Sequence, residues 1–306
     1  MKNLMALLNV FVNNILPILL LSGAGFILGR TFKLDSRPVG KVIFYIFSPV
    51  LIFNLLTTSK LAVGNIVTMM AYSASVMFVI GGIAFVIGKL LRLDRGILTV
   101  VVVTSMFANN GNFGLPLISF AFGQDALAYA SIYFVTNCVV LYTFGVIIAS
   151  LGHLDLKAAL IGLLKVPAIY AILLAIIFIR TGWSLPAPLQ KTVALTASGA
   201  VPAMLVLLGL ELHKVEWTHN LRALSIPVVC RLLIGPVVGM LLAAVYGLNT
   251  MTRNVGITDA AMPPAVMNTI LASEYKLDAS LVTAIVFVST ILSPLTLTPL
   301  IYLLGK

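Results

Sequence analysis

Long apolar stretches, separated by short polar or turn-rich breaks, follow one another along the whole chain of 306 residues. Most are close to the roughly 20 residues that a helix needs to cross a membrane. The pattern therefore predicts an all-α integral membrane protein with ten transmembrane helices. The predicted helices lie near residues 10–29, 39–58, 65–88, 97–122, 126–149, 159–180, 191–210, 222–247, 255–273 and 279–304.

Composition supports this prediction and leaves no room for a separate soluble domain. Hydrophobic residues make up 60% of the chain and charged residues only 9%, whereas soluble domains carry roughly 25% charged residues. The two cysteines, Cys138 and Cys230, lie in apolar stretches and provide no disulfide framework. We expect a multi-pass protein of the cell inner (plasma) membrane, in contact with its lipids.

The basic residues, which give a net charge of +10, are scattered in the short loops between predicted helices. They form no cluster on a polar domain, which argues against a nucleic-acid partner. If the amino terminus is outside, twelve basic residues are cytoplasmic and six are not, so the positive-inside rule predicts that both termini are non-cytoplasmic. The cytoplasmic set is Arg30, Lys33, Arg37, Lys41, Lys89, Arg92, Arg95, Lys157, Lys165, Lys214, Arg222 and Lys276, and the opposite set is Lys2, Lys60, Arg180, Lys191, Arg253 and Lys306.

The two halves of the chain resemble each other. Pro17 recurs as Pro167, and Ser48-Pro49-Val50 aligns with Val201-Pro202-Ala203. With five predicted helices per half, an odd number, the second half must enter the membrane in the opposite sense. The chain is therefore predicted to contain two inverted repeats, residues 1–150 and 151–306, an architecture common among secondary transporters.

The fourth and ninth predicted helices both contain residues that interrupt a regular helix. Gly111, Gly114 and Pro116 do so in the fourth helix, and Pro263 and Pro264 in the ninth. Main-chain groups freed in hydrocarbon are costly unless they meet protein or water in a cavity. We therefore expect two broken helices that cross near the membrane midplane and form a cavity there.

Half-helices restarting near Leu115 and Ala265 would point their partly positive amino termini at this cavity and favour an anion. Uncharged amides nearby can donate hydrogen bonds to a carboxylate that must also be released. The predicted substrate-binding residues are Asn109, Asn110, Asn112 and Asn268. A single intramembrane asparagine is as often only a contact between helices, and this alternative applies most to Asn54 and Asn137.

Few charged residues lie inside the predicted helices. Asp259, interpreted as lying at the mouth of the ninth helix, is the only acid near a break, which argues against a dedicated cation exchanger. Arg231 would brace the broken-helix carbonyls or neutralise a second substrate carboxylate, and we favour bracing. Glu211 and His213 are interpreted as a helix terminus. No catalytic, cofactor-binding or metal-binding pattern is recognisable, and the chain is not predicted to be an enzyme.

Several motifs are similar to those of the auxin efflux carrier family, which includes plant PIN auxin carriers and bacterial malonate and malate permeases. The motifs cover most of the chain: they are Asn109 to Leu117 (NNGNFGLPL), Pro263 to Val266 (PPAV), Ala272 to Tyr275 (ASEY), Phe47 to Phe53 (FSPVLIF) and Arg231 to Pro236 (RLLIGP). The chain lacks the long hydrophilic loop of many plant members and resembles the compact prokaryotic type.

The resemblance implies a scaffold domain, a transport domain whose fourth and ninth helices cross at prolines, and an elevator-like motion that carries an organic anion. It also implies that Asn109, seven residues before Pro116, contacts the substrate carboxylate. Either Pro263 or Pro264 would be the crossing residue of the ninth helix. Asn54 replaces a histidine of the plant members, which argues against auxin itself as substrate. A homodimer is what the family suggests.

The sequence thus favours a secondary transporter of a small organic anion such as malonate, malate or an auxin-like acid. One alternative is a carrier of the bile-acid or antiporter type, coupled to H⁺ or Na⁺. The other is a membrane sensor that binds a ligand on the same fold without moving it.

Overall fold

The computed structural model describes residues 2–59, 61, 63–149, 161, 164–215, 218 and 220–305. Within these ranges the chain is helical and contains no strand, only one isolated β-bridge. The predicted boundary between the two halves, at residue 150, lies outside the described residues, as do Lys60, Lys157 and Lys306.

Seven helices in the described part are long and apolar enough to cross a membrane. They span Asn3–Phe32, Ser36–Thr58, Gly64–Leu90, Gln124–Ala149, Ala187–Leu212, Leu221–Val245 and Ala279–Leu304. Two shorter apolar helices are α6 (Arg95–Met106) and α11 (Pro167–Thr181). The described part is therefore helical and has the apolar helices of a multi-pass membrane protein. Most helix ends are near those predicted, but the first helix starts at Asn3 and not near residue 10.

Most of the long helices are built from consecutive pieces that follow one another without a break. The first consists of α1 (Lys2–Val10), η1 (Phe11–Ile15) and α2 (Leu16–Phe32), and the second of α3 (Ser36–Val42), η2 (Ile43–Phe47) and α4 (Ser48–Thr58). α5 (Val63–Leu90), α12 (Ala187–Leu212) and α17 (Ala279–Leu304) are single helices. The remaining two are α8 (Gln124–Val140), η4 (Leu141–Gly145) and α9 (Val146–Ala149), and α13 (Leu221–Val229), η5 (Cys230–Ile234) and α14 (Gly235–Val245).

Four prolines of these segments follow π-helical turns, whereas Pro202, Pro227, Pro294 and Pro299 lie inside α-helices without such a turn before them. Each of these π-turns ends two residues before its proline. The turns are η1, η2, η5 and η3 (Asn110–Gly114). These prolines are Pro17, Pro49, Pro236 and Pro116. In each case the residue before the proline donates its N–H to the first residue of the π-turn. Because proline lacks an N–H and crowds the carbonyl four residues earlier, the wider turn lets the helix continue.

Side-chain caps fix several helix starts. Asp94, Asn249 and Asp278 accept hydrogen bonds from main-chain N–H groups three residues later, at the starts of α6, α15 (Thr250–Ala260) and α17. A capping side chain of this type satisfies one of the free N–H groups of the first turn. The local sequence therefore determines where these helices begin.

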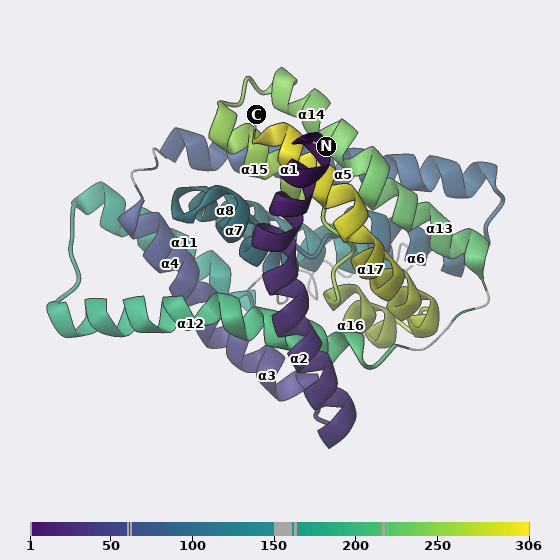
Figure 1. Ribbon diagram of the computed structural model, residues 1–306, viewed down its shortest axis with the longest axis horizontal. Coiled ribbons are helices and arrows are strands. Elements are labelled where there is room, and N and C mark those ends of the chain that lie inside the picture. Colours follow the sequence, from purple (N-terminus) through teal and green to yellow (C-terminus); the bar gives the residue numbers. More distant parts are fainter. Residues whose placement is uncertain are drawn as a thin grey trace.

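The helices pack into two groups (Figure 1). In the first group, α12 packs on α2 and α4, and α11 packs on α4. In the second group, α5 packs on α6 and α8, α14 on α15, and α13 on α6 and α17. We refer to these sets as the first and second helix groups. Contacts between the groups are fewer and involve mainly α12 with η3, α4 with α8, and α1 with α17.

Small residues bring α2 and α12 into close contact in the first group. A Cβ atom at Gly209 would overlap the carbonyl oxygen of Ser22, and one at Gly25 would overlap the carbonyl oxygen of Val206. Glycine is the only residue that allows main chains to approach this closely, as is common between membrane helices. The first helix group is therefore tightly joined along this seam.

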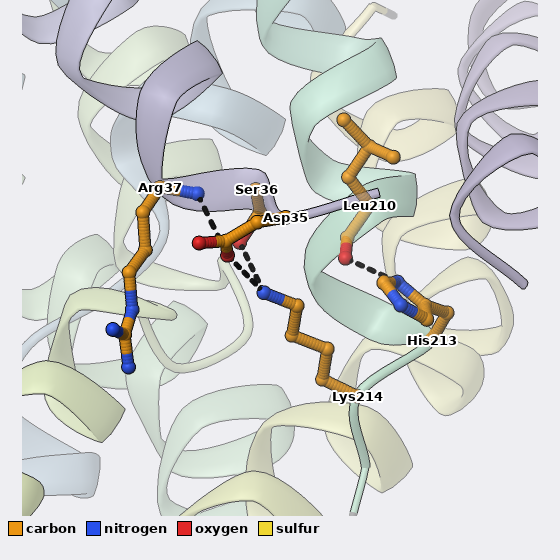
Figure 2. A network of polar contacts seen from close by, with 6 residues as sticks. All are labelled: Asp35, Ser36, Arg37, Leu210, His213 and Lys214. Carbon is orange, nitrogen blue, oxygen red and sulfur yellow. Dashed lines mark hydrogen bonds and ion pairs between the residues drawn. The ribbon is translucent and has the colours of Figure 1, made fainter. Parts of the chain in front are cut away.

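Polar contacts at the end of α12 add to this joint (Figure 2). Lys214 Nζ lies 2.5 Å from Asp35 Oδ1 and donates to Ser36 Oγ at 3.3 Å. His213 Nδ1 donates to the carbonyl of Leu210 at 2.5 Å. The hydrogen bond from the Lys214 ammonium lowers the pKa of Asp35, which lies outside the spanning segments. This pair is exposed, so we expect it to position the loop and contribute little stability.

Candidate functional site: the crossing of two broken helices

The fourth predicted helix is interrupted at residues 107–109. α6 ends at Met106, and the chain resumes as η3 and then α7 (Leu115–Phe122). The ninth predicted helix is interrupted at residues 261–266, between α15 and α16 (Met267–Glu274). Both interruptions are largely buried in protein, one of the settings in which irregular main chain is tolerated at membrane depth.

The two interruptions contact each other directly. Asn109 N donates to the carbonyl of Pro263 at 2.7 Å, and Ala265 N donates to the carbonyl of Phe107 at 2.9 Å. These two bonds form an antiparallel bridge between Ala108 and Pro264. Four main-chain groups freed by the breaks are thus satisfied by the opposite break, and the two helices cross at this bridge.

The α-helical part of the fourth segment restarts at Leu115, as predicted, but a π-helical turn precedes it and begins at Asn110. Asn109 Oδ1 caps the new helix by accepting from Asn112 N at 3.2 Å. Leu115 N donates to Asn110 O in the π-turn that accommodates Pro116. Pro116 therefore lies inside the resumed helix, and the crossing residue of this segment is Ala108.

Both prolines of the ninth helix lie in its interruption. Pro263 supplies the carbonyl that accepts from Asn109, while Pro264 is the residue bridged to Ala108. Neither can donate a main-chain hydrogen bond, so the interruption cannot close into a regular helix here.

The asparagines predicted as site residues meet at the crossing, but most of their amide nitrogens have protein partners. Asn110 Nδ2 donates to the main-chain oxygen and to Oδ1 of Asp259, at 3.1 and 2.9 Å. Asn268 Nδ2 donates to the carbonyl of Phe107 at 3.1 Å. Asn137 Nδ2 donates to the carbonyl of Ala108 at 2.8 Å. These amides hold the first interruption in place.

Asn109 and Asn112 differ from this pattern. The nitrogen Nδ2 of Asn109 is buried and has no hydrogen-bond partner among the described residues. Asn112 is partly exposed, and its Nδ2 lies 3.4 Å from Glu211 Oε2 at the end of α12. Asn109 therefore offers a free donor inside the crossing, and Asn112 connects the two helix groups.

Arg231, in η5, is almost completely buried and lies against both interruptions. Its guanidinium donates to the carbonyls of Met262 at 2.9 Å, Asp259 at 3.2 Å and Ser105 at 3.5 Å. The carbonyls of Ser105 and Asp259 belong to the last turns of α6 and α15, and that of Met262 lies in the second interruption. The contacts are those of a brace for broken-helix ends.

Two acids contact the asparagines of this site, although the sequence analysis placed Asp259 at the mouth of the ninth helix and Glu211 at a helix terminus. Asp259 lies in the last turn of α15 and is completely buried, not at the mouth of the helix. The prediction for Asp259 is wrong because the interruption begins only two residues later, at Ala261, and the crossing therefore covers this side chain. Glu211 ends α12, as predicted for a helix terminus, but the packing of α12 against η3 also brings it to Asn112. Sequence alone gives no signal for that contact.

Gly111 and Gly114 are required by close packing. A Cβ atom at Gly114 would lie 2.9 Å from Asp259 Oδ1, and one at Gly111 would lie 2.7 Å from the Phe134 ring. Both distances are too short for a real side chain, so these glycines let η3 lie against α15 and α8.

A cavity of about 410 Å³ lies between the helix groups, beside α7. Asn54 and Pro202 line it from the first group, and Ser119, Gln124 and Leu127 from the second. Asn54 is thus separate from the amides of the crossing and faces the space between the groups.

Comparison with known proteins agrees with this architecture. A family model described as membrane transport protein matches residues 10–158 and 151–302. An uncharacterized transporter of Methanothermobacter thermautotrophicus is 27% identical over 288 residues, which cover 92% of this chain and 95% of that protein. An uncharacterized transporter of Methanocaldococcus jannaschii is 25% identical over 295 residues, with the same coverage. The chain therefore belongs to the membrane transport protein family, the auxin efflux carrier family that its motifs resemble.

Proposed function

We propose that this protein is a secondary transporter that carries a small organic anion across the plasma membrane by an elevator-like motion. One observation carries the proposal: two interrupted helices cross inside the protein, and a buried amide donor, Asn109 Nδ2, lies there without a partner. Broken helices that meet at a buried polar centre are typical of the substrate sites of secondary transporters.

The chemistry of the crossing suits a carboxylate. The helix that begins at Asn110 directs its partly positive end toward Asn109. The fixed positive charge of Arg231 lies behind the crossing and favours an anion without occupying the Asn109 amide. Malonate, malate and an auxin-like acid are the candidates that the family resemblance supplies.

The division into two helix groups supports the elevator-like part of the proposal. The second group contains both broken helices, while the first contains α2, α4, α11 and α12. In this mechanism the first group is the scaffold and the second moves with its substrate, so the cavity beside Asn54 is the space where the substrate enters. Ten spans in two inverted repeats, non-cytoplasmic termini and dimerisation through the first group complete the proposed architecture.

The test is exchange of labelled anion in liposomes that contain the purified protein. Labelled malonate, malate and indole-3-acetate are each measured with unlabelled anion inside, in the original protein and in Asn109→Ser. Serine keeps the cap to Asn112 but has no N–H₂ group. We expect exchange of at least one anion and a loss of about tenfold or more in the variant, the effect of one charge-assisted hydrogen bond.

Two outcomes contradict the proposal. Equal exchange in Asn109→Ser and the original protein removes the carboxylate role of Asn109. Binding of an anion without exchange, in protein whose thermal unfolding is unchanged, favours the sensor alternative.

A further inference from the structure

The crossing contains more unpartnered acceptors than donors. The buried side-chain atoms without a hydrogen-bond partner in the described part include the oxygens Asn110 Oδ1, Asn137 Oδ1, Asn268 Oδ1 and Asp259 Oδ2, but only one nitrogen, Asn109 Nδ2. The amide orientations are not arbitrary, because each nitrogen that bonds does so to a carbonyl or carboxylate oxygen. The site that we assign to an anion therefore also has places for a cation or a proton.

Asp259 is the acid among these groups. Its side chain is completely buried, and Asn110 Nδ2 is the side-chain donor to Oδ1. Arg231 contacts the main-chain oxygen of Asp259, and no ion pair to the Asp259 carboxylate is found among the described residues. A buried carboxylate with one donor and no contacting cation is poorly compensated, and protonation removes that cost.

The titratable groups around Asp259 come from three elements. η5 provides Arg231, α8 provides Tyr133 and α5 provides Tyr72, all buried. In the described parts of η3, α7, α14 and α17 we find no further titratable group that acts on Asp259. Tyrosine is neutral at physiological pH, so Arg231 and Asp259 decide the net charge of the crossing.

We propose that the Asp259 carboxyl is the proton-binding site of this carrier and takes up one proton with each monoanion. The inference rests on the proposed function. Without substrate, the positive Arg231 and an ionised Asp259 cancel. A bound monoanion would leave one uncompensated negative charge in a buried site, which is costly. A proton from the aqueous side, bound at Asp259 Oδ2, restores neutrality because Arg231 then balances the anion.

The geometry favours a proton over a sodium ion. A metal cation bound by oxygens needs several ligands around one point. Asp259 is the only carboxylate at the crossing bridge in the described part, and its main-chain oxygen is already bonded to Arg231 and to Asn110. A proton needs only the free lone pair of Oδ2.

The first experiment needs no substrate. Infrared difference spectra of the purified protein in lipid nanodiscs are recorded across pH, and the C=O stretch of a protonated carboxyl is followed. We expect a band from a buried carboxyl that is lost in Asp259→Asn and retained in Glu211→Gln. Asp278→Asn is the matched control, because Asp278 is exposed and asparagine can keep its cap at the start of α17. Identical bands in Asp259→Asn and the original protein would overturn the inference.

The second experiment tests coupling in liposomes with the anion that exchanges. We expect an inward proton gradient to drive accumulation of the anion severalfold in the original protein and in Asp278→Asn, and to drive none in Asp259→Asn. Equal drive in Asp259→Asn overturns the inference, and so does accumulation driven by a sodium gradient at constant pH. If no anion exchanges, the proposed function fails, while the infrared titration still decides whether Asp259 binds a proton.

Discussion

At the scale of single residues, the crossing depends on polar groups that satisfy freed main-chain atoms. Asn137 and Asn268 donate to carbonyls of the first interruption, and Arg231 donates to carbonyls next to both. Buried carbonyls without partners are destabilising, so these side chains make the broken helices possible. Asn109 differs because its amide nitrogen supports no protein group in the described part.

Arg231→Met is expected to destabilise the protein. It removes the donors to the carbonyls of Met262 and Asp259, which stay buried, and we expect a loss on the order of 3 kcal/mol. The measurement is the midpoint of thermal unfolding in detergent. Arg222→Met, at an exposed position at the start of α13, is the control and should change little. Unchanged stability in Arg231→Met, with weakened anion binding, would show that Arg231 acts on the substrate and is not a brace.

At the scale of helices, single prolines leave the helix continuous in this protein, and adjacent prolines do not. Pro49 and Pro116 follow a π-turn, while Pro202 and Pro294 lie inside α-helices. Where Pro263 and Pro264 are adjacent, the helix is interrupted and its main chain pairs with another break. The first interruption contains no proline. There the side chain of Asn109 caps the next helical turn by accepting a hydrogen bond from Asn112 N.

The seam between α2 and α12 should be intolerant of added volume. Gly209→Ala places a Cβ atom against the carbonyl of Ser22, and we expect a loss of at least about 1–3 kcal/mol from overpacking. Gly23→Ala is the matched control in α2, because open space surrounds that position and alanine favours a helix. The measurement is the midpoint of thermal unfolding of both variants. Equal midpoints in Gly209→Ala and Gly23→Ala would mean that the contact between α2 and α12 has room for the added Cβ atom.

At the scale of the whole molecule, the elevator-like proposal requires the two helix groups to move relative to each other. Their contacts include Asn112 with Glu211 near the crossing and Tyr302 OH with Asn3 Oδ1, at 3.3 Å, between α17 and α1. Movement must break such contacts, whereas contacts inside one group should persist.

Cross-linking between the groups should therefore stop transport. Asn3→Cys with Tyr302→Cys, joined by a short reducible reagent in a variant without Cys138 and Cys230, is expected to lose exchange and regain it on reduction. Ser75→Cys with Tyr246→Cys is the control, because these side chains lie 2.7 Å apart within the second group. Full exchange in the cross-linked Asn3 and Tyr302 variant would contradict relative motion of the groups.

The sequence by itself determined the class of molecule, the approximate helix limits and the two segments that are interrupted. Apolar length and turn residues are local properties, and a membrane leaves few alternatives to a helix. Even the capping residues Asp94, Asn249 and Asp278 stand directly before their helices.

Only the tertiary structure decided where the fourth segment breaks and what its polar groups contact. Pro116 looked like the breaking residue, but a π-turn absorbs it, and the break at residues 107–109 is stabilised by pairing with Pro263 and Ala265. The burial of Asp259 and the approach of Glu211 to Asn112 likewise depend on helices far apart in sequence. Partners of this kind are set by packing, because a polar group in hydrocarbon must be satisfied by whichever neighbour the fold brings to it.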